Sequence, residues 1–126
     1  MRPKEGFQMP DTILNLIVIR STDFDHSAQF YQALGLTFVK HRHGNGLDHL
    51  SCELGHVVFE IYPRTSESDS TVFTRLGFRV PSVDGAVEQL QKIGVKVISP
   101  PKDSPWGRRA VVDDYDGHRV ELTQGN

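Results

Sequence analysis

Apolar residues recur at helical spacing in two segments of the chain. In the first segment they are Phe24, Ala28, Tyr31 and Leu34, and in the second they are Val83, Val87, Leu90 and Ile93. Steps of three and four residues place such side chains on one helix face. Each segment begins with a residue type that caps helices, Asp23 or Ser82, and is followed by a glycine, Gly35 or Gly94. The pattern predicts two helices of about three turns each.

Short runs rich in β-branched and aromatic residues surround both helices. One strand is predicted before each helix, at 12–20 and at 71–80. Three more strands are predicted after each helix, at 37–42, 48–54 and 57–62 in the first half and at 96–99, 109–113 and 119–123 in the second. Turn-forming residues separate them at 43–47, 55–56, 100–107 and 116–117. The order strand, helix, three strands therefore occurs twice.

The two halves also match in sequence. When residues 20–38 are aligned with residues 79–97, arginine, aspartate, glutamine and glycine fall on their own kind without a gap. Such self-similarity indicates an old duplication. We predict an α+β fold of two tandem βαβββ modules that form a mixed-sheet cleft. The first module spans 12–63 and the second 71–124, within a single domain of residues 12–124. Residues 64–70 link the modules, and residues 1–11 form a flexible arm.

Composition narrows the classes of partner. The chain of 126 residues has 37% hydrophobic and 24% charged residues, as an ordinary globular domain does. Its net charge of -2 argues against nucleic acid or an anionic membrane as a partner. A lone Cys52 fits a reducing compartment, and no segment has the apolar length of a signal peptide or a membrane span. We therefore expect a cytoplasmic protein.

Strand alternation separates the residues under each helix from those on the opposite, open face of each sheet. The open face of the first half is predicted to carry Leu16, His49, Glu60 and Tyr62. That of the second half is predicted to carry Phe73, Arg75, Arg79 and Glu121. Two acids and two arginines thus project into an otherwise apolar concavity.

Several segments together resemble the glyoxalase, bleomycin-resistance and extradiol-dioxygenase superfamily, also called the vicinal oxygen chelate group. They are residues 23–35 with Phe30-Tyr31 and Leu34-Gly35-Leu36, Val58-Phe59-Glu60-Ile61, Gly77-Phe78-Arg79-Val80, Pro105-Trp106-Gly107, and residues 116–122. The resemblance covers nearly the whole chain after residue 11. It implies paired βαβββ modules and a homodimer, a state that is also common among soluble proteins in general.

Enzymes of this superfamily bind a divalent metal through a His or Gln on the first strand of each module and a Glu on the last. Here Glu60 and Glu121 fill the glutamate positions, but Leu16 and Arg75 fall on the first-strand positions. Leucine has no donor atom, and arginine stays protonated. We therefore expect no cofactor. A divalent metal would have to bind through Glu60, Glu121 and a non-standard ligand. Arg75 is predicted to form a salt bridge with Glu60, Glu121 or both.

Other residues have a functional and a plain interpretation. His49 is either a substitute ligand or general base, or a hydrogen-bonded side chain. Trp106 forms either a pocket wall or ordinary loop packing, and Cys52 is expected to be buried and inert. The remaining histidines, His26, His41, His43, His56 and His118, are expected to be solvated.

Three functions remain open from the sequence. The first is metal-free binding of a small molecule in the cleft, with Arg75, Leu16, Phe73, Tyr62, Trp106 and Arg79 as ligand contacts. The second is a metal-dependent lyase, isomerase or dioxygenase that uses Glu60, Glu121 and an unexpected ligand. The third is metal-free acid/base catalysis by Glu60 and Glu121, in which unequal surroundings raise one pKa. Fold alone does not decide among them.

Overall fold

The computed structural model describes residues 11–125, and most of the predicted arm (residues 1–10) lies outside them. The first half contains β1 (Leu16–Ser21), α1 (Phe24–Ala33), β2 (Val39–His41), β3 (His49–Leu54) and β4 (Val57–Pro63). A short 3-10 helix, η1 (Glu67–Asp69), lies in the predicted linker. The second half contains β5 (Leu76–Arg79), α2 (Val83–Lys92), β6 (Val97–Ser104), β7 (Gly107–Asp113) and β8 (Arg119–Thr123). The predicted α+β fold of two βαβββ units is confirmed.

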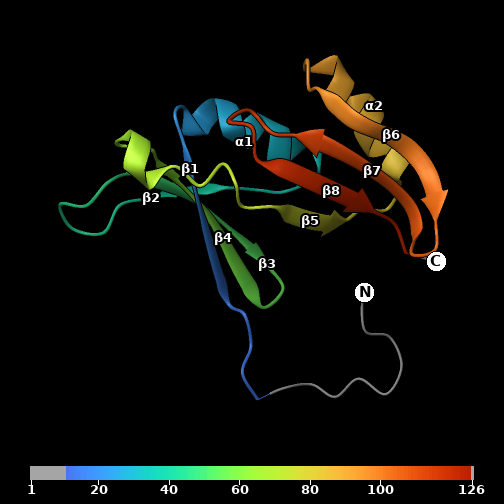
Figure 1. Ribbon diagram of the computed structural model, residues 1–126. Coiled ribbons are helices and arrows are strands. Elements are labelled where there is room, and N and C mark those ends of the chain that lie inside the picture. The colour runs from blue at the N-terminus through green and yellow to red at the C-terminus, as the bar shows by residue number, and fades with distance from the viewer. Residues whose placement is uncertain (1–10, 126) are drawn as a thin grey trace.

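Each half forms its own four-stranded sheet (Figure 1). The first sheet has the order β1-β4-β3-β2 and the second has the order β5-β8-β7-β6. In both, the first strand is parallel to the last, and the remaining pairs are antiparallel. This identical topology is what a duplicated module produces, since each helix carries the chain across one face of its sheet.

The helix ends follow the predicted capping pattern. The Asp23 side chain accepts a hydrogen bond from the His26 backbone N–H, and the Ser82 side chain accepts one from Gly85. Gly35 has a φ of 101° and lies just past the end of α1, where a left-handed backbone ends the helix. The equivalence of the two helices in sequence thus extends to how each one starts.

One apolar core joins the two halves. It contains fully buried side chains from both sheets and both helices, with α1 packed against α2: Ile19, Tyr31, Phe59, Ile61, Val83, Leu90, Val112, Val120 and Leu122. Tyr31 packs edge-on against Phe30 and Phe59, with ring centroids 4.7 and 5.0 Å apart. The helices cover only one face of each sheet, so the opposite, open faces are not packed against a helix and can contact a bound molecule or another chain.

Three predicted boundaries are wrong. The strands predicted at 12–20 and 71–80 begin only at Leu16 and Leu76. Residues 100–107 were predicted to be a turn, but β6 continues to Ser104. β6 is an edge strand, so Pro100 and Pro101 remove no hydrogen bond to a strand on its outer side. On its inner side the register against β7 shifts twice between Val97 and Lys102, which accommodates the two prolines.

The turn that follows β6 is tight. Gly107 has a φ of 107°, and a Cβ atom there would lie 2.8 Å from the Gln124 carbonyl oxygen. The glycine predicted as part of a loop is therefore required by the close approach of the β6–β7 hairpin to the chain after β8.

Candidate functional site

Strand pairing places the polar residues of the first sheet on its open face, away from α1. Glu60 on β4 lies between Val18 on β1 and Ser51 on β3. Two residues further along β4, Tyr62 lies beside Arg20. The predicted alternation is correct here, because Phe59 and Ile61 on the same strand are buried in the core.

His49 and Glu60 meet on this open face. The Nε2 atom of His49 lies 3.3 Å from the Glu60 Oε2 atom. The His49 ring is only 1% exposed, because it stacks on the Tyr62 ring with centroids 4.2 Å apart and planes 5° apart. Its Nε2 atom has no directed hydrogen bond within the described chain, whereas Nδ1 faces the Leu47 carbonyl oxygen at 3.4 Å. A proton can pass between the His49 imidazole and the Glu60 carboxylate, or between either group and a bound molecule.

The stack continues across the sheet. The His41 and His43 rings lie 5.9 and 5.4 Å from the His49 ring, and the Arg20 guanidinium lies 5.3 Å above the Tyr62 ring. His41 and His43 are exposed, as predicted. The open face of the first sheet therefore presents a row of planar side chains at one end and the Glu60 carboxylate near its middle.

The second sheet places arginines around its glutamate. Glu121 on β8 lies directly opposite Gly77 on β5 and Val111 on β7. Arg109 donates a hydrogen bond to Glu121 Oε1 at 3.4 Å, and the Arg75 guanidinium lies 4.0 Å from the same oxygen. Glu121 is 8% exposed, so the arginines compensate for the burial of its charge.

The predicted salt bridge of Arg75 is present with Glu121, at the outer limit of an ion pair. No ion pair joins Arg75 to Glu60 within residues 11–125, because the two side chains belong to different sheets and Glu60 faces His49. Arg109 is a further partner of Glu121 that the sequence analysis did not predict. Arg109 pairs with Thr123, two residues beyond Glu121 on β8, and this register brings its side chain to Glu121.

The donor atoms do not suit the metal that the fold family implies. Leu16 and Arg75 supply no lone pair, and Glu121 is held by a guanidinium, which leaves Glu60 and the neighbouring His49 imidazole as two ligand types at this site. In the part of the chain that the structure describes, no three or more His, Cys, Asp or Glu side chains are grouped so that they could hold a metal ion.

The other predicted contact residues are placed differently from one another. Leu16 and Arg79 lie on β1 and β5, and both are exposed. Phe73 lies in a turn before β5 rather than in a strand, and its side chain is 99% exposed. Trp106 is at the tip of the β6–β7 hairpin. Cys52 is buried on the helix side of its sheet, as predicted.

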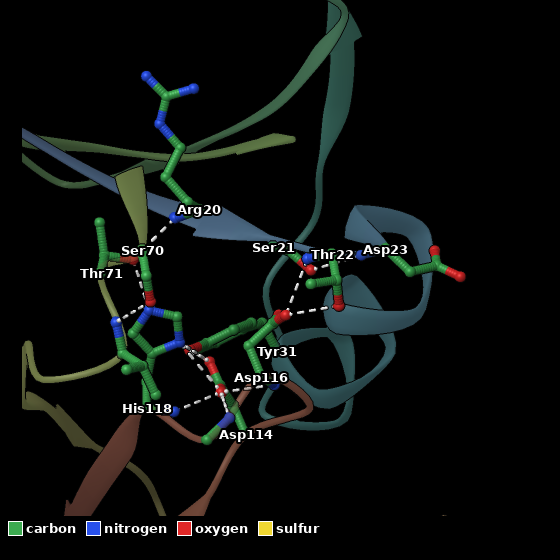
Figure 2. Close-up of polar contacts among 12 residues, drawn as sticks. Arg20, Ser21, Thr22, Asp23, Tyr31, Ser70, Thr71, Asp114, Asp116 and His118 are labelled. Atoms are coloured by element: carbon green, nitrogen blue, oxygen red, sulfur yellow. Dashed lines mark hydrogen bonds and ion pairs between the residues drawn. The ribbon is translucent and has the colours of Figure 1, made fainter. Parts of the chain in front are cut away.

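The expectation that His118 is solvated is wrong. His118 is 1% exposed and lies in a polar network between the two halves (Figure 2). Its Nδ1 atom lies 2.9 Å from the Asp114 carboxylate, and its Nε2 atom lies 2.6 Å from the Thr71 hydroxyl. Asp114 also accepts a hydrogen bond from the Tyr31 hydroxyl at 2.5 Å. Turn residues adjacent to glycine are usually exposed, whereas here the ring lies between Asp114 of its own turn and Thr71, which is distant in the chain.

The same network extends to the end of β1. Thr71 accepts a hydrogen bond from the Arg20 backbone N–H, and Asp116 accepts two from Thr22 (Figure 2). The ionised Asp114 carboxylate can only accept, so the His118 Nδ1 atom carries the proton that lies between them. In the neutral ring Nε2 is then an acceptor, and the Thr71 hydroxyl donates to it. The Asp114, His118 and Thr71 side chains all have hydrogen-bond partners, whereas the buried Asp116 Oδ2 atom has none within the described residues. Because these contacts join β1 of the first half to the β7–β8 turn of the second, we assign the network a structural role at the junction of the halves.

A concavity of about 400 Å³ lies beside this junction. It is lined by residues of α1, of the turn after α2 and of the β7–β8 turn, among them His26, Phe30, Ile93 and Tyr115. The His26 and Tyr115 rings stack on each other at 4.2 Å. The Asp114 carboxylate nearby is engaged in the structural network and that of Asp113 in its ion pair with Arg119, whereas Asp116 is bonded only through Oδ1 and its Oδ2 atom has no partner within the described residues.

Residues 13–122 match the glyoxalase/bleomycin resistance protein/dioxygenase superfamily. The chain belongs to this superfamily. A protein of Mycolicibacterium smegmatis whose function is uncharacterized is 27% identical over 110 residues, which are 87% of this chain and 91% of that protein. This relative covers nearly the same region as the superfamily match.

Solved structures of other proteins share the fold. TnmS3, an antibiotic binding protein from Streptomyces sp. CB03234, superposes with a TM-score of 0.72 at 24% identity, over 94% of this chain and all of that one. A glyoxalase/bleomycin resistance protein from the same strain superposes with a TM-score of 0.67 at 25% identity, over 89% of this chain and all of that one. Within residues 11–125, neither helix has the length and apolar character that crossing a membrane requires.

Proposed function

We propose that the protein binds a small organic molecule in a cleft formed by the open faces of its two sheets. It does so without the divalent metal that enzymes of the superfamily use. The observation that carries this proposal is the Arg75 guanidinium beside Glu121, where a metal ligand would be needed. An antibiotic binding protein with the same fold, TnmS3, supports a binding role for this architecture. Glu60, His49, Tyr62 and Leu16 contribute one wall of the proposed cleft.

The metal-free part of this proposal is tested by metal retention. The purified protein is incubated with nickel, zinc, manganese or ferrous iron, dialysed, and compared with the Glu60→Gln and Glu121→Gln variants. We expect no retained equivalent of metal in any of the three proteins, because Arg75 stays protonated beside Glu121. Retention of about one equivalent that both variants lose would contradict the proposal and direct attention to glyoxalase or dioxygenase chemistry.

We further propose a homodimer in which these faces are brought together. Apolar side chains on or near the open faces are strongly exposed in one chain: Leu14 is 66%, Leu16 is 50%, Val39 is 57% and Phe73 is 99% exposed. Leu14 and Leu16 lie at the β1 edge of the first sheet and Val39 lies on β2 at its other edge, so exposed apolar side chains border this face on both sides, which favours a covered surface. Size-exclusion chromatography with light scattering is expected to give twice the 14.2 kDa of the chain. A monomer at all concentrations would contradict this proposal.

Acid/base catalysis remains a second candidate, because His49 Nε2 lies 3.3 Å from Glu60 and has no directed hydrogen bond within the described chain. In such a role His49 would remove a proton from the bound molecule, and Glu60 would stabilise the imidazolium that forms. A metal-free turnover that His49→Gln abolishes while ligand affinity is retained would favour catalysis. Equal ligand binding with no turnover in either protein would favour binding alone.

A further inference from the structure

The open face of the second sheet carries a concavity of about 450 Å³. Its lining includes Arg75, Gly77, Arg79, Glu121 and Thr123. This volume is within the range of pockets that hold small organic molecules. Gly77 lies between the two arginines, and a Cβ atom placed there would meet only the Glu121 backbone oxygen, at 3.9 Å. The floor of the concavity is therefore bare backbone, with a guanidinium on either side.

The charges around this concavity do not balance. Three guanidinium groups, from Arg75, Arg79 and Arg109, face one carboxylate, that of Glu121. The register places Arg79 and Arg109 on either side of Thr123 in one rung. Arg119, further along β8, forms an ion pair with Asp113 at 3.2 Å, so those two charges offset each other. The surplus in the concavity is positive.

The guanidinium groups of Arg75 and Arg79 also have unused donors. Each carries five N–H groups. Within residues 11–125, neither side chain donates a hydrogen bond, and Arg75 has only its 4.0 Å contact with Glu121. Arg109 in contrast bonds Glu121 directly, which neutralises the carboxylate that would otherwise repel an anion. Two cations with free donors thus flank a bare floor next to a carboxylate that is already engaged.

We propose that this concavity binds the carboxylate of a small organic acid, with Arg75 and Arg79 contacting its oxygen atoms. This inference rests on the proposed function of the cleft and specifies the charge of its ligand. The planar fork of a guanidinium matches the two oxygens of a carboxylate and holds them by charge-assisted hydrogen bonds. The fixed positive charge at Arg75 then supplies the attraction for oxygen atoms that a divalent cation supplies elsewhere in the superfamily.

The test uses three probes with one ring system and different charges: naphthoate, naphthalenemethanol and naphthylmethylammonium. Titration calorimetry with the full chain near neutral pH is expected to show naphthoate binding about tenfold more tightly than the alcohol, and the ammonium most weakly. Arg75→Leu and Arg79→Leu should each lower naphthoate affinity about tenfold and leave the affinity for the alcohol unchanged. Arg75→Lys keeps the charge but loses the fork, so it should fall between Arg75→Leu and the unaltered protein.

The matched control is Arg108→Leu. Arg108 lies next to Arg109 on β7 but pairs with Asp84 of α2, so it is on the opposite side of the sheet. This variant removes the same charge and should leave naphthoate affinity unchanged. Circular dichroism verifies that each variant is folded. Equal affinity for the three probes, or an equal loss in Arg108→Leu, would overturn the assignment of an anionic ligand while leaving cleft binding intact. Absence of binding by all three probes would overturn both proposals.

Discussion

Replacing Asp114 with alanine is expected to lower the free energy of unfolding by about 3 kcal/mol or more. The Asp114 side chain is fully buried and accepts hydrogen bonds from three backbone N–H groups of the β7–β8 turn, from His118 and from Tyr31. Alanine would leave these donors without a partner in the interior, and each buried unsatisfied donor costs about 1–3 kcal/mol. The junction between the two halves would weaken as a whole.

Urea denaturation followed by circular dichroism measures this loss. Asp113→Ala is the matched control, because Asp113 is the preceding residue and forms an ion pair with the half-exposed Arg119. Such a pair contributes about 0.2–1 kcal/mol, so the control should lose less than about 1 kcal/mol. Equal losses in the two variants would show that the network does not hold the junction together.

Stability is expected to fall steeply at alkaline pH because of Tyr31. Burial raises the pKa of the Tyr31 hydroxyl well above its ordinary value of 10.0, and the Asp114 carboxylate, by its charge and its hydrogen bond, raises this pKa further. Above about pH 10 the unfolded chain loses the tyrosine proton while the folded protein retains it. The contribution of the protonated Tyr31 hydroxyl to the free energy of unfolding is therefore fully present below about pH 10. Above that pH it falls by about 1.4 kcal/mol per pH unit.

Urea denaturation at a series of alkaline pH values tests this prediction. Tyr31→Phe removes the titrating group, so its stability should decline less steeply with pH than that of the unaltered protein. Tyr115→Phe is the control, since Tyr115 is 47% exposed and outside the network. That variant should keep the full slope. If Tyr31→Phe kept the same slope, another group would be responsible for the alkaline loss.

The fold could be predicted because its determinants are local or repeated. Helix spacing, the capping residues Asp23 and Ser82, and the glycines after each helix act within a few residues of chain. The gap-free match of residues 20–38 with 79–97 then fixed the same topology twice. Strand ends were less predictable. Apolar character continues at Ile13 and Val72, but backbone pairing does not, because pairing depends on where the neighbouring strand ends.

The candidate site was predicted in part. Alternation placed Glu60, His49 and Tyr62 on the open face of the first half, where His49 contacts both other residues, and it placed Arg75 and Glu121 on the open face of the second half. It could not find Arg109, whose contact with Glu121 depends on the register of β7 against β8. It also could not choose between Glu60 and Glu121 as the partner of Arg75, since alternation assigns a side chain to a face and does not set distances between sheets.

The sequence by itself determined the doubled βαβββ order, the helix ends, the strand residues that share a face and the fact that Leu16 and Arg75 carry no metal-ligating atom. These follow from local backbone preference, periodicity and the chemistry of single side chains. Only the tertiary structure decided that His118 is buried between Asp114 and Thr71, that Arg109 holds Glu121, and that His49 stacks on Tyr62. These contacts join residues far apart in the chain or on different strands, and burial and register, which sequence spacing does not encode, bring them together.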